Sequence, residues 1–233
     1  MDIMIFTGLL LIGGLLNFIW EPSNKTVHCL AKCYLLLAIY MAFVAWVFYF
    51  AGIKNAFLLK ALDVLLHYGG YLAHLVLGYL AGNILMGIRS KDAQENLLET
   101  RAILNITLWA LSVSIGNSFL VSTVGKVVYM NDMIAFFKQS GYAMWFLYFI
   151  MAAESTGAIG ILLHFKFKMG SLAAIGLVLI MLGAICTHWH NHDSFSDSYA
   201  AVSQLISLSL ILFLYYLERQ IVPKPADTQI YVV

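Results

Sequence analysis

The stretch Met151–Asp193, MAAESTGAIGILLHFKFKMGSLAAIGLVLIMLGAICTHWHNHD, decides the class of fold. It holds the second half of one apolar segment, Tyr142–Leu163, and the whole of another, Gly170–Thr187, and each segment has about 20 residues, the length that an α-helix needs to cross the hydrocarbon core of a bilayer. A short basic turn separates the two segments, and a histidine-rich sequence follows the second. The first segment carries one acid, Glu154. Because a carboxylate in hydrocarbon is costly, Glu154 is a candidate functional residue.

The composition extends this interpretation to the whole chain. Of the 233 residues, 62% are hydrophobic and 11% are charged, and the mean hydropathy is +0.86. Soluble domains are about 45–50% apolar and about 25% charged. We therefore predict an all-α, polytopic helix bundle in the lipid bilayer. The net charge of +1 and the lack of a basic tract predict no binding to nucleic acid.

About seven transmembrane helices are predicted from the apolar stretches, which are Ile3–Trp20, Cys29–Ile53, Ala56–Ile88, Ile103–Val124, Tyr142–Leu163, Gly170–Thr187 and Tyr199–Leu217. Between the third and fourth stretches lies the hydrophilic sequence SKDAQENLLETR, for which we predict a surface helix. The predicted organisation is an N-terminal three-helix membrane segment (1–89), a polar cytoplasmic connector (90–101), a four-helix membrane domain (102–218) and a polar tail (219–233).

The distribution of Lys and Arg predicts the orientation, because cytoplasmic loops carry an excess of these residues. With the N-terminus outside, nine lie on the inner side, namely Lys25, Lys32, Arg89, Lys91, Arg101, Lys166, Lys168, Arg219 and Lys224. Four lie on the outer side, namely Lys54, Lys60, Lys126 and Lys138. We therefore predict an external N-terminus and a cytoplasmic C-terminus, with a bacterial inner membrane as the expected location and the histidines on its periplasmic side.

The second half of the chain carries four motifs in a definite order. They are Gly125-Lys126, the loop sequence FFKQSGYAMW (Phe136–Trp145), ESTGAIGILL (Glu154–Leu163), and ML-G-A-x-x-x-H (Met181–His188). Over about residues 103–217, their order and spacing resemble the DoxX family of four-helix membrane proteins. The three helices that precede this region depart from the family's four-helix pattern.

The resemblance implies a four-helix bundle with both termini in the cytoplasm. Members of the family include a subunit of a quinone-linked thiosulfate oxidoreductase, so the resemblance implies a quinone-linked redox protein or a membrane subunit of a redox complex. The expected partner is another membrane or periplasmic subunit, or a second copy of the chain. Two alternatives remain open, which are a non-catalytic membrane scaffold or assembly subunit and a small-solute or proton-coupled transporter.

Lys126, Glu154 and His188 form the first set of candidate site residues. Glu154 lies twelve residues after Tyr142, which places it about 18 Å into the membrane at ~1.5 Å per residue. An ionised carboxylate at that depth needs a partner or water. Lys126 could extend inward along its stem or outward to the interface. The chemical interpretation is a proton relay or a site for a quinone headgroup, and the alternative is a structural hydrogen bond between helices.

His188, His190, His192 and Asp193 form the second set. If HWHNHD is extended, its alternation places the three imidazoles on one side. Imidazole and carboxylate groups suit a divalent metal ion, and Asp197 could be a further ligand. The alternatives are reversible protonation at the interface and ordinary surface polarity.

Asp63, His67 and His74 form the third set, because their spacing places them on one face of a helix. That face is expected to point into the bundle, where His67 and His74 could line a cavity for a cofactor. Haem is not expected, because a second histidine on a facing helix is missing at membrane depth.

Small residues are expected to let the helices approach closely. Gly78 and Gly82 form one such pair, and Gly157 with Gly160 and Gly176 with Gly183 form two more. For all of them, close packing is the predicted role.

Overall fold

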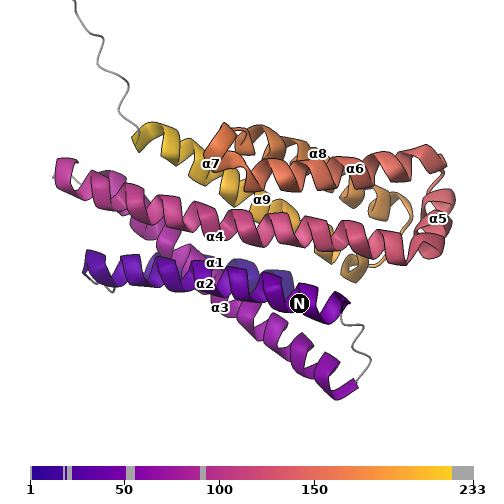
Figure 1. Cartoon of the computed structure of the whole chain (residues 1–233), viewed down its shortest axis with the longest axis horizontal. Helices are drawn as coiled ribbons and strands as arrows, with labels where there is room; N and C mark the ends of the chain where they lie inside the picture. Colours follow the sequence, from indigo (N-terminus) through magenta and orange to yellow (C-terminus); the bar gives the residue numbers. More distant parts are fainter. Residues whose placement is uncertain (1, 18, 20–22, 51–55, 90–92, 222–233) are drawn as a thin grey trace, which may run out of the picture.

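The computed structural model of the chain describes residues 2–17, 19, 23–50, 56–89 and 93–221. The side chains of residues 2–4, 6, 24, 48–50, 56–70, 89, 93–97, 196 and 221 lie outside the description. The described part consists of helices and short connections without strands, which confirms the predicted all-α fold. In chain order the helices are α1 (Asp2–Leu16), α2 (Asn24–Phe50), α3 (Ala56–Arg89), α4 (Ala93–Val128), α5 (Met130–Gln139), α6 (Met144–Leu162), α7 (His164–Phe167), α8 (Gly170–His190) and α9 (Phe195–Ile221) (Figure 1).

Six of these helices are long and apolar enough to cross a membrane, namely α2, α3, α4, α6, α8 and α9. Helix α1 is also apolar, but its apolar part, Thr7–Leu16, is shorter than the six candidate spans. With α1 included, the described chain has seven such apolar helices, as predicted. An apolar helix is the form in which a spanning segment satisfies its own backbone hydrogen bonds in lipid. The protein is therefore a multi-pass integral membrane protein.

Helices α4, α6, α8 and α9 form a closed bundle, because α4 and α8 each contact both α6 and α9. Figure 1 shows the four helices side by side, with the short helix α5 across one end. Apolar side chains of α4 and α9 are buried in the protein, among them Leu108 and Ile115 of α4 and Leu208 and Ile211 of α9, each at most 2% exposed. We refer to the two ends of the bundle as the α5 end and the α7 end.

The three N-terminal helices pack beside this bundle. Helices α2 and α3 contact α4, and α1 packs against α3. A Cβ atom on Gly78 would collide with the backbone of Leu10, and one on Gly82 would meet the backbone of Gly14. The predicted packing role of Gly78 and Gly82 is confirmed.

Two predictions about local structure differ from the structure. One is the separate surface helix predicted for SKDAQENLLETR, and the other is the loop predicted for FFKQSGYAMW. From Ala93 onward, the predicted connector is continuous with α4 instead of forming its own surface helix. Strong helix formers such as Ala, Gln, Glu and Leu in this segment explain the continuation. The motif FFKQSGYAMW begins within α5, and the turn comes at Gly141, whose φ of 78° is the left-handed conformation that glycine adopts readily.

Candidate functional site

Lys126 of α4 and Glu154 of α6 form an ion pair near the α5 end. The Lys126 ammonium lies 2.6 Å from Oε2 of Glu154 and also donates a hydrogen bond to Oγ of Ser122, at 2.9 Å. The hydroxyl of Thr123 donates to the same carboxylate oxygen at 3.4 Å. The Lys126 side chain therefore extends inward, toward Glu154, and not outward to the interface.

Both charges of the pair are largely removed from the surface. The side chains of Lys126 and Glu154 are 18% and 5% exposed. Two charges taken out of water are tolerated when they compensate each other and find further hydrogen-bond partners. Ser122 and Thr123 supply those partners, so the pair is a complete polar unit within an apolar wall.

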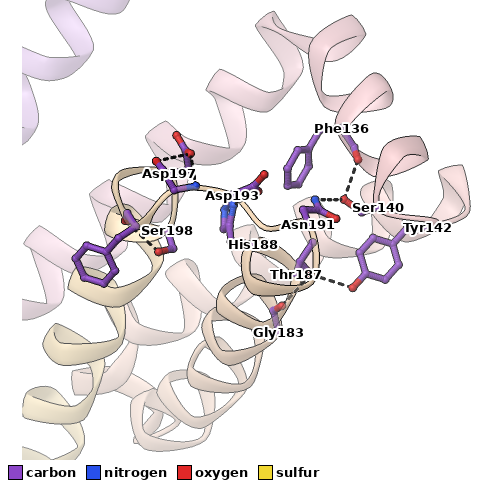
Figure 2. A network of polar contacts seen from close by, with 12 residues as sticks. Phe136, Ser140, Tyr142, Gly183, Thr187, His188, Asn191, Asp193, Asp197 and Ser198 are labelled. Carbon is purple, nitrogen blue, oxygen red and sulfur yellow. Dashed lines mark hydrogen bonds and ion pairs between the residues drawn. The ribbon is translucent and has the colours of Figure 1, made fainter.

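His188 lies at the C-terminal end of α8, and its Nδ1 is 2.8 Å from Oδ2 of Asp193 (Figure 2). Its ring lies 5.5 Å from the ring of Phe136 in α5, measured between centroids. His188 therefore connects the α8–α9 turn to the helix that covers this end of the bundle.

Two further hydrogen bonds fix α5 and the start of α6 to the end of α8 (Figure 2). Tyr142 and Thr187 are joined through their hydroxyls at 2.9 Å, and the Thr187 hydroxyl donates to the carbonyl of Gly183. Because Thr187 has one hydroxyl proton, Tyr142 is the donor between the two. Asn191 donates to Ser140 at 2.8 Å. The α5 end is thus a fixed cover on the bundle.

The predicted extended conformation of HWHNHD is wrong. His188 and His190 belong to α8. Residues two positions apart on a helix point in directions about 200° apart around its axis, so these two side chains lie on nearly opposite faces. His192 follows in the turn with a φ of 58°. Asp197, the suggested fourth ligand, accepts hydrogen bonds from Ser194.

The geometry therefore separates the side chains that were predicted to hold a metal ion. Among the described residues, no group of three His, Cys, Asp or Glu side chains is arranged to bind a metal. The two members that meet, His188 and Asp193, form an ion pair or hydrogen bond with each other.

A cavity of about 1160 Å³ lies among α4, α5, α6, α8 and α9. Lys126, Glu154 and His188 all line it, so the structure brings the first predicted set to one cavity. Along α6 the lining runs from Phe146 to Gly160, about 21 Å at ~1.5 Å per residue. The cavity is therefore elongated along the bundle axis.

The polar and apolar parts of this lining are separated along its length. Lys126 and His188 are on the α5 side and Glu154 is near the middle of the α6 wall, whereas toward the α7 end the wall consists of residues such as Met169, Leu172 and Ala173. Leu172 and Leu179 line the cavity and are also exposed at the protein surface. The cavity therefore opens sideways, where the acyl chains of the bilayer lie against the helices.

The glycines of this region divide into two groups. A Cβ on Gly157 would meet Leu177, and one on Gly160 would meet Ala173, as expected for close packing. On α8, a Cβ on Gly176 or Gly183 would meet nothing within 4 Å. For these two the predicted packing role is wrong. They line the cavity and keep its α8 wall open.

The third predicted set lies on α3, outside this bundle. The side chains of Asp63 and His67 are outside the described residues. His74 is half-buried, has an interaction partner, and is not part of the cavity lining. The structure thus brings Lys126, Glu154 and His188 to the cavity, and does not bring His74 to it.

The structure also contains a polar cluster at the α7 end that we did not predict. His164 is buried, and its Nε2 lies 3.0 Å from Oε2 of Glu218, while Lys168 lies 2.8 Å from the other carboxylate oxygen. The amide of Gly170 donates to Nδ1 of His164 at 3.2 Å. Because Nδ1 accepts that hydrogen bond, it carries no proton, so His164 is neutral and donates from Nε2 to Glu218.

Gly170 is the residue that permits this cluster to form. A Cβ at this position would lie 2.6 Å from the ring of His164 and 2.5 Å from the hydroxyl of Tyr215, which stacks on that ring. We expect Gly170→Ala to lower the free energy of unfolding by about 1–3 kcal/mol, since extra volume in a packed site forces its neighbours apart. Thermal unfolding in mild detergent measures the change.

The matched control for Gly170→Ala is Gly176→Ala on the same helix, because nothing lies within 4 Å of a Cβ there. Gly176→Ala should be neutral or slightly stabilising, since Ala favours a helix over Gly by about 1 kcal/mol. Equal stability of the two variants would mean that the cluster accommodates the methyl group and that the close approach is not required.

Comparison with known protein families gives a match over the second half of the chain. Residues 110–212 match the model of the DoxX-like family, which confirms the resemblance inferred from the motifs for this segment. The match extends from the middle of α4 through most of α9, and so includes Lys126, Glu154 and His188. No curated protein and no solved structure matches the chain.

Proposed function

From a DoxX-like segment that contains the cavity and its ion pair, we propose that the protein is a quinone-linked membrane redox protein or the membrane subunit of a redox complex. The observation that carries the proposal is the combination of a buried Lys126–Glu154 pair with a long apolar cavity that opens toward lipid. A quinone has a ring with two carbonyl oxygens and a long apolar tail. The charged part of the cavity lining suits the ring, and the apolar part suits the tail.

In this proposal the quinone ring lies at the α5 end and its tail follows the α6–α8 wall toward the α7 end. The Lys126 ammonium is the hydrogen-bond donor to a ring carbonyl oxygen. The tail occupies the space beside Gly176 and Gly183, where α8 lacks side-chain volume. The lateral opening next to Leu172 and Leu179 is the route of entry from the bilayer.

Glu154 has the role of a proton carrier in the reaction. Reduction of the quinone to a quinol takes up two electrons and two protons. The electrons come from a reduced inorganic sulfur compound, the class of reductant that the family resemblance implies. A carboxylate beside the ring can take up a proton, pass it as the carboxylic acid to a reduced ring oxygen, and repeat the cycle for the second proton.

The topology and the partner belong to the same proposal. The charge distribution supports an orientation with the α5 end on the outer side of a bacterial inner membrane and the α7 end in the cytoplasm. His188 and Asp193 then face the outer aqueous phase. A second subunit, or a second copy of the chain, presents the reductant at that end.

Blocking the tail part of the cavity is the direct test. We expect Gly176→Leu to weaken binding of a decyl-tailed benzoquinone at least about tenfold, or about 1.4 kcal/mol, because the new side chain occupies the space that the tail needs. The free cavity accepts the side chain without a collision at Cβ, so the protein should still fold. Titration of purified protein in mild detergent measures the affinity.

Cys186→Leu is the control, because Cys186 lies on the same helix, is exposed and does not line the cavity. It should bind the quinone as the native chain does. Absence of quinone binding by the native protein, or equal affinity of the native and Gly176→Leu proteins, would rule out this cavity as a quinone site.

A further inference from the structure

A second pocket, of about 550 Å³, lies between the N-terminal parts of α2 and α4. From α2 it is lined by Lys25, His28, Cys29 and Lys32, whose spacing places them on one face of the helix. Across the pocket, Leu98, Ala102 and Ile103 of α4 form an apolar wall. Two lysines therefore face an apolar surface at the edge of the four-helix bundle.

The pocket lies at the level where a membrane meets water. The apolar stretches of α2 and α4 begin at Cys29 and Ile103 in the sequence, and both of these residues line the pocket. Figure 1 shows the N-terminal ends of both helices at the end of the molecule opposite α5. Along α2, Lys25 and Lys32 are about 10 Å apart, so one lysine lies about one turn before the start of the apolar stretch at Cys29 and the other about one turn after it.

The charge of the pocket favours an anion. Its lining carries the two lysines against the single carboxylate of Glu99. The same end of the bundle also carries Lys168 and Arg219, which reach Glu218 and Ser171 respectively. An anionic group in the pocket would thus lie in a region of predominantly positive potential.

We propose that this pocket binds an anionic membrane lipid, with the phosphate between Lys25 and Lys32 and an acyl chain against Leu98, Ala102 and Ile103. Basic pockets between transmembrane helices recognise such headgroups, and the start of the apolar stretches at Cys29 and Ile103 places the pocket at the headgroup layer. A free phosphate ion would use the lysines alone, whereas a phospholipid also covers the apolar wall. The lipid joins the N-terminal helices to the four-helix bundle at this end.

The test measures binding of tail-labelled fluorescent phosphatidylglycerol to the full chain in non-ionic detergent, by fluorescence anisotropy. Phosphatidylcholine with the same tails is the zwitterionic comparison. We expect the anionic lipid to bind more tightly, and the Lys25→Gln/Lys32→Gln protein to bind it about 25-fold more weakly, from about fivefold for each lysine. The charge-preserving Lys25→Arg/Lys32→Arg protein should retain the preference, and Lys138→Gln, a change at the α5 end, should have no effect.

Three results would overturn the proposal. One is equal binding of the two lipids by the native chain, and another is an unchanged preference in the double Gln variant. The third is complete displacement of the lipid by inorganic phosphate, which would identify a site for a free anion. If the double Gln variant does not fold, Ala102→Trp provides the same test, because it fills the pocket and leaves both lysines in place. That variant should also lose the anionic lipid, and undiminished binding would contradict the proposal.

Discussion

Replacement of Lys126 by Met should prevent the protein from accumulating in the membrane in a folded form. The substitution leaves the Glu154 carboxylate, which is 5% exposed, without its cationic partner. Breaking a buried ion pair from one side costs about 3–5 kcal/mol, because the remaining charge stays buried and uncompensated. The amount of monodisperse protein after detergent extraction, and its thermal unfolding midpoint, measure the effect.

The double variant Lys126→Met/Glu154→Gln separates folding from chemistry. Removing both charges removes the electrostatic conflict, so the double variant should recover most of the stability that Lys126→Met loses. It should not recover quinone binding, because the donor to the ring carbonyl is absent. Lys138→Met, at an exposed lysine of α5, is the control for loss of a positive charge at the same end. Native-like stability of Lys126→Met would show that the pair contributes nothing to folding.

The sequence was sufficient to identify Lys126 and Glu154 as candidate site residues, because what marks each of them is local to its own helix, but it did not predict that they form an ion pair. Glu154 is conspicuous in an apolar segment, and Lys126 belongs to a motif at the end of the preceding apolar segment. An ionised carboxylate in such a segment needs a partner or water, and the sequence left the direction of the Lys126 side chain open. The packing of α4 against α6 brings the two side chains together. The fold class followed from the same reasoning, since an apolar segment of about 20 residues has few other stable forms in a bilayer.

The histidine segment shows where pattern alone misleads. A histidine at every second position over six residues suits a strand, but here the pattern continues directly from an apolar helix. The helix ends only at His190, because each further turn adds a backbone hydrogen bond at little additional entropic cost. A strand at this position would have had no neighbouring strand in the described chain with which to pair.

The cluster at the α7 end could not be predicted for a different reason. His164 and Glu218 are 54 positions apart in the sequence, and each is unremarkable near the end of an apolar helix. Their pairing depends on how α7 and α9 approach each other, which in turn requires the small residue Gly170. Such a contact is a property of the packed bundle, and the pattern within either segment contains no signal for it.

Substitution of Gly78 by Ala is expected to detach α1 from the rest of the protein. A Cβ on Gly78 would collide with the backbone carbonyl of Leu10 and lie 2.8–2.9 Å from the neighbouring backbone carbons. A backbone cannot rotate away as a side chain can, so the helices must separate. We expect a loss of about 1–3 kcal/mol or more in the free energy of unfolding. Unfolding in detergent and the efficiency of a disulfide cross-link between cysteines introduced into α1 and α3 measure the separation.

The size of this effect follows from how α1 is held. Helix α1 has 15 residues, packs mainly against α3 and makes only slight contact with α9. Without a hydrophobic driving force between helices in lipid, close packing is the principal attraction that keeps it in place.

Gly8→Ala is the matched control. Gly8 lies on α1, the partner of α3 in this interface, and nothing lies within 4 Å of a Cβ at that position. If Gly78→Ala and Gly8→Ala were equally stable and cross-linked equally well, the α1–α3 interface would have to be looser than the structure has it. If Gly78→Ala alone fails while quinone binding persists, the cavity of the four-helix bundle functions independently of α1.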